Sequence, residues 1–184
     1  DRGITSIGEG CQGMLINHCQ FLSAEEPLDV ADRVSIGMNV NANDVKIKDC
    51  RATRFRHWAV MGGQNHLISG NHFFQGDNVP NGVRTAGIIL QEYFSASMLT
   101  GNYVDNCFIE WMNERDATPA FTGGFSFSSL PIADNVYLSG DVAPWFTYIV
   151  IKPYAAGHFL NGVAVTGNRF RSINGSIARA ETVD

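Results

Sequence analysis

The sequence predicts an all-β protein in which short strands repeat along the chain as a solenoid. Its 184 residues are 45% hydrophobic and 17% charged, with 19 glycines and 12 phenylalanines. That composition favours a turn-rich β protein over a helical bundle. Apolar residues alternate with polar ones rather than recurring with a helical period, as at Val45 and Ile47 or Val163 and Val165. The third observation is a short phrase that recurs along the chain.

The phrase reads apolar, any, apolar, polar, small or polar, Asn, any, apolar. Clear copies are HLISGNHF (66–73), SMLTGNYV (97–104) and VAVTGNRF (163–170). Weaker copies are MLINHCQF (14–21), VKIKDCRA (45–52) and VYLSGDVA (136–143). The Asn slot is then filled in turn by Cys19, Cys50, Asn71, Asn102, Asp141 and Asn168. The phrase stays constant while the intervals vary, as in a solenoid that combines fixed strands with elastic loops.

The Asn of the phrase has a structural role in this interpretation. Gly and Asn tolerate left-handed backbone angles, so a Gly-Asn pair after a strand supplies a sharp corner. In stacked turns the Asn side chains lie about 4.8 Å apart, one strand spacing. Their amides can then hydrogen-bond along the stack as a ladder. We therefore expect Asn71, Asn102 and Asn168 to be structural rather than catalytic.

The phrase, its Asn slot and the turn length resemble the right-handed parallel β-helix superfamily, the pectate-lyase-like fold. The resemblance covers roughly residues 13–180 and implies about six coils of three short strands each. We expect a single domain over residues 1–184 that is part of a longer chain. The superfamily includes lyases, glycoside hydrolases, epimerases, phage tailspikes and adhesins, so the resemblance implies a fold rather than one activity.

Each expected coil contributes one strand to each of three sets, and the Asn corner joins its second strand to its third. Second strands are expected near 14–17, 45–48, 66–69, 97–100, 136–139 and 163–166. Third strands are expected near 20–22, 51–55, 72–75, 103–104, 144–146 and 169–173. First strands are expected near 34–38, 58–61, 87–92, 107–112 or 125–129, 147–152 and 176–179.

Two files of inward residues should stack through the coils. The first contains Ile16, Ile47, Ile68, Leu99, Leu138 and Val165. The second contains Phe21, Ala52, Phe73, Val104, Ala143 and Phe170. Its alternation of large and small residues suits interdigitated packing.

Charge and hydropathy disfavour several classes of partner. The net charge of −5 argues against a general electrostatic nucleic-acid binder. No stretch approaches 18 consecutive apolar residues, so we expect no transmembrane helix and no membrane partner. The four cysteines form no CxxC pair and no zinc-spaced cluster with histidine, so the residues predict no metal site.

The densest acidic cluster is the candidate catalytic site. Glycoside hydrolases use two carboxylates, and the candidates here are Glu110, Glu114 and Asp116. In CFIEWM (107–112), an inward Ile109 places Glu110 outward, beside the long loop that carries the other two acids. The alternative interpretation is a solvated, charged loop base.

A second candidate group follows the segment TYIVIK. Alternation there predicts Ile149 and Ile151 inward and Tyr148 outward. Lys152 could serve as the base of a lyase, with Tyr154 and His158 contacting an acidic sugar. The alternative is that these side chains are simply solvated at a strand end.

Further candidate binding residues are Glu92 and the surface aromatics, which could stack on sugar rings. The aromatic candidates are Tyr93, Tyr103, Trp111, Trp145 and Tyr154.

For a lyase, the resemblance implies calcium held by carboxylates. For a tailspike-like member it implies a homotrimer. The calcium-binding aspartates are absent at matching positions, as are the paired-Asp and His-Gly motifs of polygalacturonases and the Asp-Pro-His motif of alginate epimerases. No catalytic residue is therefore carried over.

The expected function is polysaccharide recognition by a module of a secreted or virion-surface protein, located outside the cell or at a virion or cell surface. Cleavage of an acidic glycan, as a lyase or a glycoside hydrolase, is one version of this expectation. A non-catalytic structural or adhesive module is the alternative.

Cys19 and Cys50 occupy the Asn slot in adjacent coils. At a strand spacing of about 4.8 Å, the two residues lie within disulfide reach. Both stacked thiols and a disulfide remain open at this point.

Overall fold

The computed structural model describes residues 2–22, 36–53, 55, 57–74, 86–105, 108–111, 125–139, 147–151, 158–172 and 179–182. Within these ranges the regular secondary structure is β-strand, with no helix. A search of the same ranges finds no helix with the length and apolar character that a membrane crossing requires. The predicted all-β class is confirmed.

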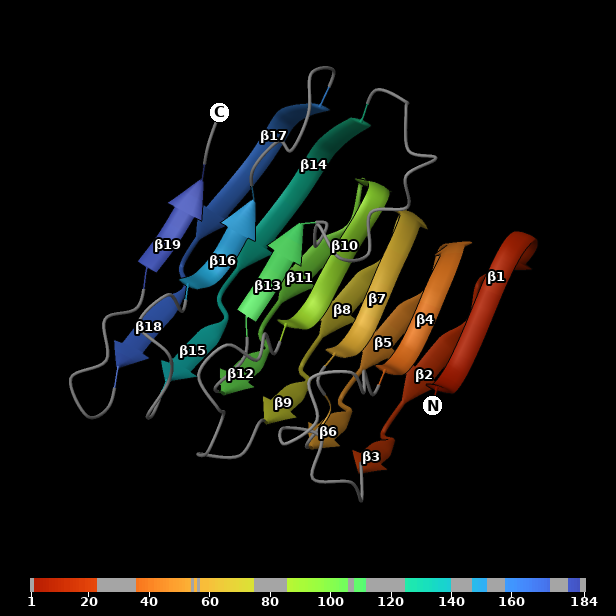
Figure 1. Ribbon diagram of the computed structural model, residues 1–184, viewed down its shortest axis with the longest axis horizontal. Coiled ribbons are helices and arrows are strands. Elements are labelled where there is room, and N and C mark those ends of the chain that lie inside the picture. The colour runs from red at the N-terminus through yellow and green to blue at the C-terminus, as the bar shows by residue number, and fades with distance from the viewer. Residues whose placement is uncertain are drawn as a thin grey trace, which may run out of the picture.

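The strands form three sheets in which all neighbours pair in parallel (Figure 1). Sheet 1 contains β1 (Arg2–Gln12), β4 (Ile36–Asn43), β7 (His57–Gln64), β10 (Ala86–Ser95), β13 (Phe108–Trp111), β16 (Thr147–Ile151) and β19 (Arg179–Thr182). Sheet 2 contains β2 (Leu15–Asn17), β5 (Lys46–Lys48), β8 (Leu67–Ser69), β11 (Met98–Thr100), β14 (Phe125–Ala133) and β17 (His158–Thr166). Sheet 3 contains β3 (Gln20–Leu22), β6 (Arg51–Thr53), β9 (His72–Phe74), β12 (Tyr103–Asp105), β15 (Val136–Ser139) and β18 (Arg169–Ser172).

The chain passes through sheets 1, 2 and 3 in turn and then returns to sheet 1. Neighbours within each sheet are three strands apart in chain order, so each round adds one strand to every sheet. In Figure 1 the rounds progress from the red end at β1 to the blue end at β19. The repeated phrase corresponds to the short strands of sheets 2 and 3.

Two left-handed corners give each round its shape. In the first four rounds the first corner lies between the strands of sheets 1 and 2, and in the last two it lies within β14 and β17. The second corner lies between sheets 2 and 3 and follows five residues after the first, as in Gly13 and His18 or Asn65 and Gly70. The corner residues have φ between 48° and 71°; they are Gly13, Asp44, Asn65, Ala96, Ser129 and Gly162 at the first corner, and His18, Asp49, Gly70, Gly101, Asp134 and Gly167 at the second. The constant spacing explains why the phrase keeps its length.

The inward rows follow the predicted files in five of the six rounds. Paired residues in sheet 2 are Ile16, Ile47, Ile68, Leu99, Ile132 and Val165. Paired residues in sheet 3 are Phe21, Ala52, Phe73, Val104, Tyr137 and Phe170.

The fifth round is where the prediction was wrong. Its phrase is LPIADNVY (130–137), so Asn135 and not Asp141 fills the Asn slot. Ile132 and Tyr137 replace Leu138 and Ala143 in the two files. Pro131 interrupts the strand pattern of this copy, and Ala133 stands where the phrase has a polar residue. Proline is disfavoured inside sheets because it lacks an N–H donor.

Two strand assignments change with this shift. Residues 136–139 form β15 in sheet 3, and residues 125–129 belong to β14 in sheet 2. The strand that sheet 1 uses in that round is β13, so the alternative 107–112 is confirmed in position. Asp141 and the expected third strand 144–146 lie outside the described residues.

Aromatic side chains fill the interior between sheets 1 and 3. Trp58 packs on Phe73 with ring centroids 4.2 Å apart, and Phe21 lies 6.5 Å from the same indole. The prediction that Tyr148 points outward was wrong, because it is only 2% exposed and its hydroxyl donates to the Arg171 carbonyl at 2.7 Å. The register of β16 shifts between Thr147 and Ile149, and a bulge of this kind breaks simple alternation.

Candidate functional site

The Asn slot forms a continuous hydrogen-bonded ladder. The amide nitrogen Nδ2 of Asn71 donates to Asn102 Oδ1, Asn102 donates to Asn135, and Asn135 donates to Asn168, at 2.9–3.0 Å. Main-chain N–H groups of the same residues also donate along the stack, as from Asn71 N to Asn102 Oδ1 at 3.1 Å. These amides are fully engaged in holding the corner, which is the structural role expected of them.

The predicted catalytic and binding residues are only partly placed by the structure. Glu92 lies on β10, Glu110 and Trp111 lie on β13, and His158 begins β17. The side chains of these four residues are not described. Glu114, Asp116, Lys152 and Tyr154 lie outside the described residues.

The strand register shows the surroundings of Glu110. It pairs with Ile89 and Val150, and Ile89 pairs with Val60. Val60 and Val150 are 4% and 8% exposed, so this row is buried at both described positions. His158 lies in sheet 2 and Glu110 in sheet 1, so these two candidates belong to different sheets.

A groove of about 440 Å³ lies on the outward side of sheet 3. It crosses β6, β9 and β12, whose central residues Ala52, Phe73 and Val104 are buried in the core. Residues on either side of a central position point the opposite way. The groove is lined by Arg51, Gly70, Asn71, His72, Phe74, Gly101, Tyr103 and Asp105.

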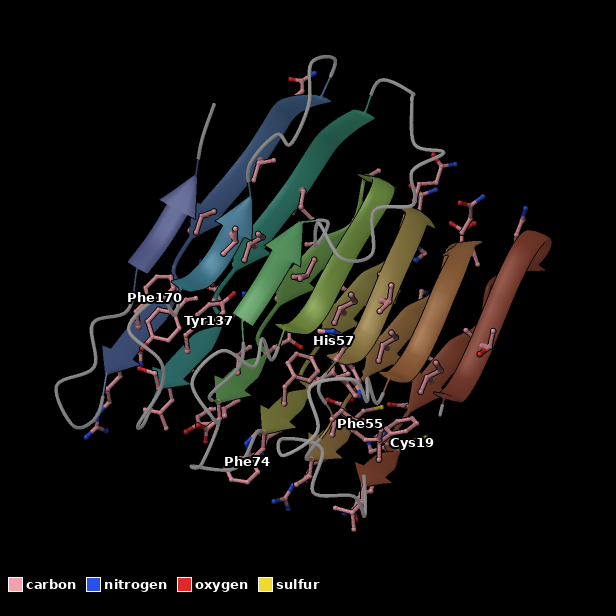
Figure 2. All side chains as sticks on the ribbon, in the orientation of Figure 1. Cys19, Phe55, His57, Phe74, Tyr137 and Phe170 are labelled. Carbon is pink, nitrogen blue, oxygen red and sulfur yellow. The ribbon has the colours of Figure 1, made fainter. Side chains whose placement is uncertain are left out.

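Aromatic rings form the centre of the groove. His72 and Tyr103 are paired residues on β9 and β12, and their rings meet edge to face with centroids 4.7 Å apart. Phe74, on the same strand as His72, lies edge to face with it at 6.4 Å. Phe74 lies on the outer side of β9 in Figure 2. The three rings therefore offer an apolar surface that is partly open to solvent.

Two charged groups flank the rings at opposite corners. Arg51 pairs with His72, and Asp105 pairs with Phe74. Burial lowers the pKa of the His72 imidazole below its usual value, and the positive charge of Arg51 lowers it further. His72 Nε2 is buried without a hydrogen-bond partner among the described residues. The His72 ring is therefore neutral at pH 7 and contributes an uncharged aromatic edge.

The sequence analysis counted Tyr103 among the surface aromatics and Asn71 in the Asn slot, but it did not single out Arg51, His72, Phe74 or Asp105. The signal was present in the third strands RAT, HFF and YVD, where polar or aromatic residues flank a single inward position. Stacking these three strands by their central residues places Arg51, His72 and Tyr103 in one row.

The described residues contain no group of three His, Cys, Asp or Glu side chains that could hold a metal ion. No protein-family model matches the chain, and neither a search of curated proteins nor one of solved structures finds a match. A functional hypothesis rests accordingly on the geometry of sheet 3.

Proposed function

We propose that the three sheets are the faces of a right-handed parallel β-helix, and that the groove on sheet 3 binds a polysaccharide. The cyclic strand order, the parallel pairing and the Asn ladder support this architecture. The right hand is supported by the strong preference of parallel crossover connections. A chain with this role would meet its ligand outside the cell or at a virion or cell surface.

The observation that carries the binding proposal is the cluster of Tyr103, His72 and Phe74 between Arg51 and Asp105. The C–H face of a sugar ring is apolar and stacks on aromatic side chains, which bring large contact area with fixed geometry. Sugar hydroxyls can donate to a carboxylate and accept from a guanidinium. The groove offers both kinds of contact within one lining.

The direction of the groove suits a polymer. It crosses three neighbouring strands along the stacking direction, a distance of about 10 Å at the usual strand spacing. A ligand lying in it would meet the Arg51–His72–Tyr103 row on one side and the Phe74–Asp105 row on the other.

The groove supports binding rather than glycoside hydrolysis. Among its described lining residues Asp105 is the one carboxylate, whereas glycoside hydrolysis uses two. The proposal at this site is therefore recognition of a glycan without its hydrolysis.

Glycan binding by calorimetry against neutral and acidic oligosaccharides tests the proposal. We expect Tyr103→Ala to weaken binding by about tenfold, because the variant removes a stacking ring. Tyr103→Phe keeps the ring and should bind within about twofold of the parent chain. Met98→Ala is the matched control, since Met98 is 46% exposed on sheet 2, away from the groove. Failure of the parent chain to bind any glycan, or equal binding by folded Tyr103→Ala, would overturn the proposal.

A further inference from the structure

The first two rounds carry cysteine where the later rounds carry the ladder asparagines. Cys19 lies between β2 and β3, and Cys50 lies between β5 and β6. Both are free thiols in the structure. The Arg51 N–H donates to the Cys19 carbonyl at 2.9 Å, so the two cysteines are neighbours across the stack.

The side chains of this slot stack directly on one another. In later rounds the slot brings Asn71 Nδ2 to 3.0 Å from Asn102 Oδ1. Equivalent residues in adjacent parallel strands lie about 4.8 Å apart, inside the range of Cα separations that disulfides span. The Cα spacing expected for the cysteine pair therefore lies within the range that a disulfide spans, and a small local shift brings the two sulfurs together.

The thiols also interact with each other. Burial raises the pKa of the Cys50 thiol, a backbone hydrogen bond from Cys19 lowers it, and the Cys19 thiol raises it through its charge and a side-chain hydrogen bond. The Cys19 thiol donates to the Asn17 carbonyl at 3.3 Å, and the Cys50 thiol donates to the Lys48 carbonyl at 3.1 Å.

The two thiols differ in access to solvent. Cys19 is partly exposed, whereas Cys50 is 2% exposed. A soluble oxidant can therefore reach Cys19 first. β2 and β3 are edge strands of sheets 2 and 3, so a bond to Cys50 would tie an edge round to the round behind it.

We propose that Cys19 and Cys50 form a redox-sensitive modification site that a low-molecular-weight disulfide converts to an intrachain disulfide. The Cys19 sulfur loses its proton and attacks the small disulfide, which forms a mixed disulfide and releases one small thiolate. The Cys50 sulfur then loses its proton and attacks the Cys19 sulfur, which releases the second thiolate. The two protons pass to the released thiolates, the protein dithiol is oxidised and the small disulfide is reduced to two thiols.

Incubation of the folded chain with oxidised glutathione, followed by acid quenching and mass spectrometry, tests this site. A Cys11→Ser background removes the cysteine that shares a tryptic peptide with Cys19. We expect a Cys19–Cys50 link and a loss of two thiols per chain. Accumulation of glutathione on Cys19 while Cys50 stays free would overturn the proposal.

Single variants separate the two steps. Cys50→Ser should stop at a mixed disulfide on Cys19. Cys19→Ser should leave Cys50 unmodified over the same time, because its sulfur is buried. Modification of Cys50 at the parent rate in Cys19→Ser would contradict the assigned order.

Hydrogen exchange measures whether the Cys19–Cys50 disulfide stabilises the edge round. We expect oxidation to slow amide exchange in β2 and β3 at least several-fold, and glutathione treatment of Cys50→Ser to leave it unchanged. Equal exchange before and after oxidation of the parent chain would show that the link does not secure the edge round.

Discussion

Replacing Asn102 by alanine removes the middle of the asparagine ladder. Its Oδ1 accepts from Asn71 N and Asn71 Nδ2, and its Nδ2 donates to the Ile68 carbonyl and to Asn135 Oδ1. All four contacts measure 3.0–3.1 Å, and Asn102 is 2% exposed.

The expected loss follows from which groups are left without a partner. The Asn71 N–H loses its acceptor in a buried site, at a cost of about 1–3 kcal/mol. Loss of the other three contacts costs less, because the groups that made them keep another partner. Asn71 Nδ2, for example, still donates to the Ile47 carbonyl. Together we expect the free energy of unfolding to fall by about 2–5 kcal/mol. That is a large share of the roughly 5–15 kcal/mol typical of a folded domain.

Urea denaturation followed by circular dichroism measures this change. Asn161→Ala is the matched control, because Asn161 is exposed on β17, and we expect it to shift the unfolding free energy by under about 0.5 kcal/mol. Asn102→Cys gives this round the cysteine that the second round carries in the same slot. The Cys50 thiol donates to a carbonyl there, so the new thiol can do the same. Its loss should be smaller than that of the alanine variant. If Asn102→Ala loses no more stability than Asn161→Ala, the ladder does not stabilise the corner and the reasoning is refuted.

Two further predictions concern the corners. Gly70 and Gly101 have φ of 67° and 65°, but a Cβ on Gly70 would lie 2.5 Å from Asp49 Oδ1, whereas nothing lies within 4 Å of one on Gly101. Gly101→Ala should therefore lower the free energy of unfolding by about 1–2 kcal/mol through backbone strain alone, and Gly70→Ala should lower it by more. In a double-mutant cycle measured by urea denaturation, Asp49→Gly should remove the difference between the two alanine variants. Burial lowers the pKa of the His66 imidazole in the folded chain, so the unfolded chain binds the proton more readily. The contribution of neutral His66 to stability is therefore present above about pH 6.5, the usual pKa of histidine. It is lost as the pH falls from that value toward the lower pKa of the folded chain. His66→Ser should lose stability less steeply between pH 7 and pH 5 than the parent chain in pH-dependent thermal melts, and an identical slope would contradict the assignment.

Most of the fold is predictable because one physical constraint repeats. Two left-handed corners stand five residues apart in every round that the structure describes, so the phrase keeps its length. Inward rows such as Ile68 and Leu99 follow from this spacing. The fifth round departs from the phrase because Pro131 stands inside its strand and Ala133 replaces the polar residue before the corner. At the corner itself Asp134 adopts φ of 56°, as Asp49 does at 52° in the second round.

The candidate site was harder to predict than the fold. Closeness in the sequence predicts the acidic cluster of Glu110, Glu114 and Asp116, whose side chains lie outside the described part of the structure, so this cluster stays a prediction. The groove on sheet 3 has a different origin, because stacking brings together residues one round apart, as His72 and Tyr103 are. Their proximity follows only from aligning the rounds correctly and then reading the outward positions. Local density along the chain carries no information about such rows.

The two sides of each strand in sheet 3 have separate tasks, which makes folding and binding experimentally separable. Phe73 and Val104 are at most 1% exposed and pack in the core, whereas their neighbours His72 and Tyr103 line the groove. Phe73→Ala should cost about 3–5 kcal/mol of stability through the cavity it leaves. Tyr103→Ala should instead change ligand affinity and leave most of the stability intact. If the inward residues stay the same, the outward residues can change and form a recognition surface without altering the fold. In sheet 3 these outward residues are aromatic and charged.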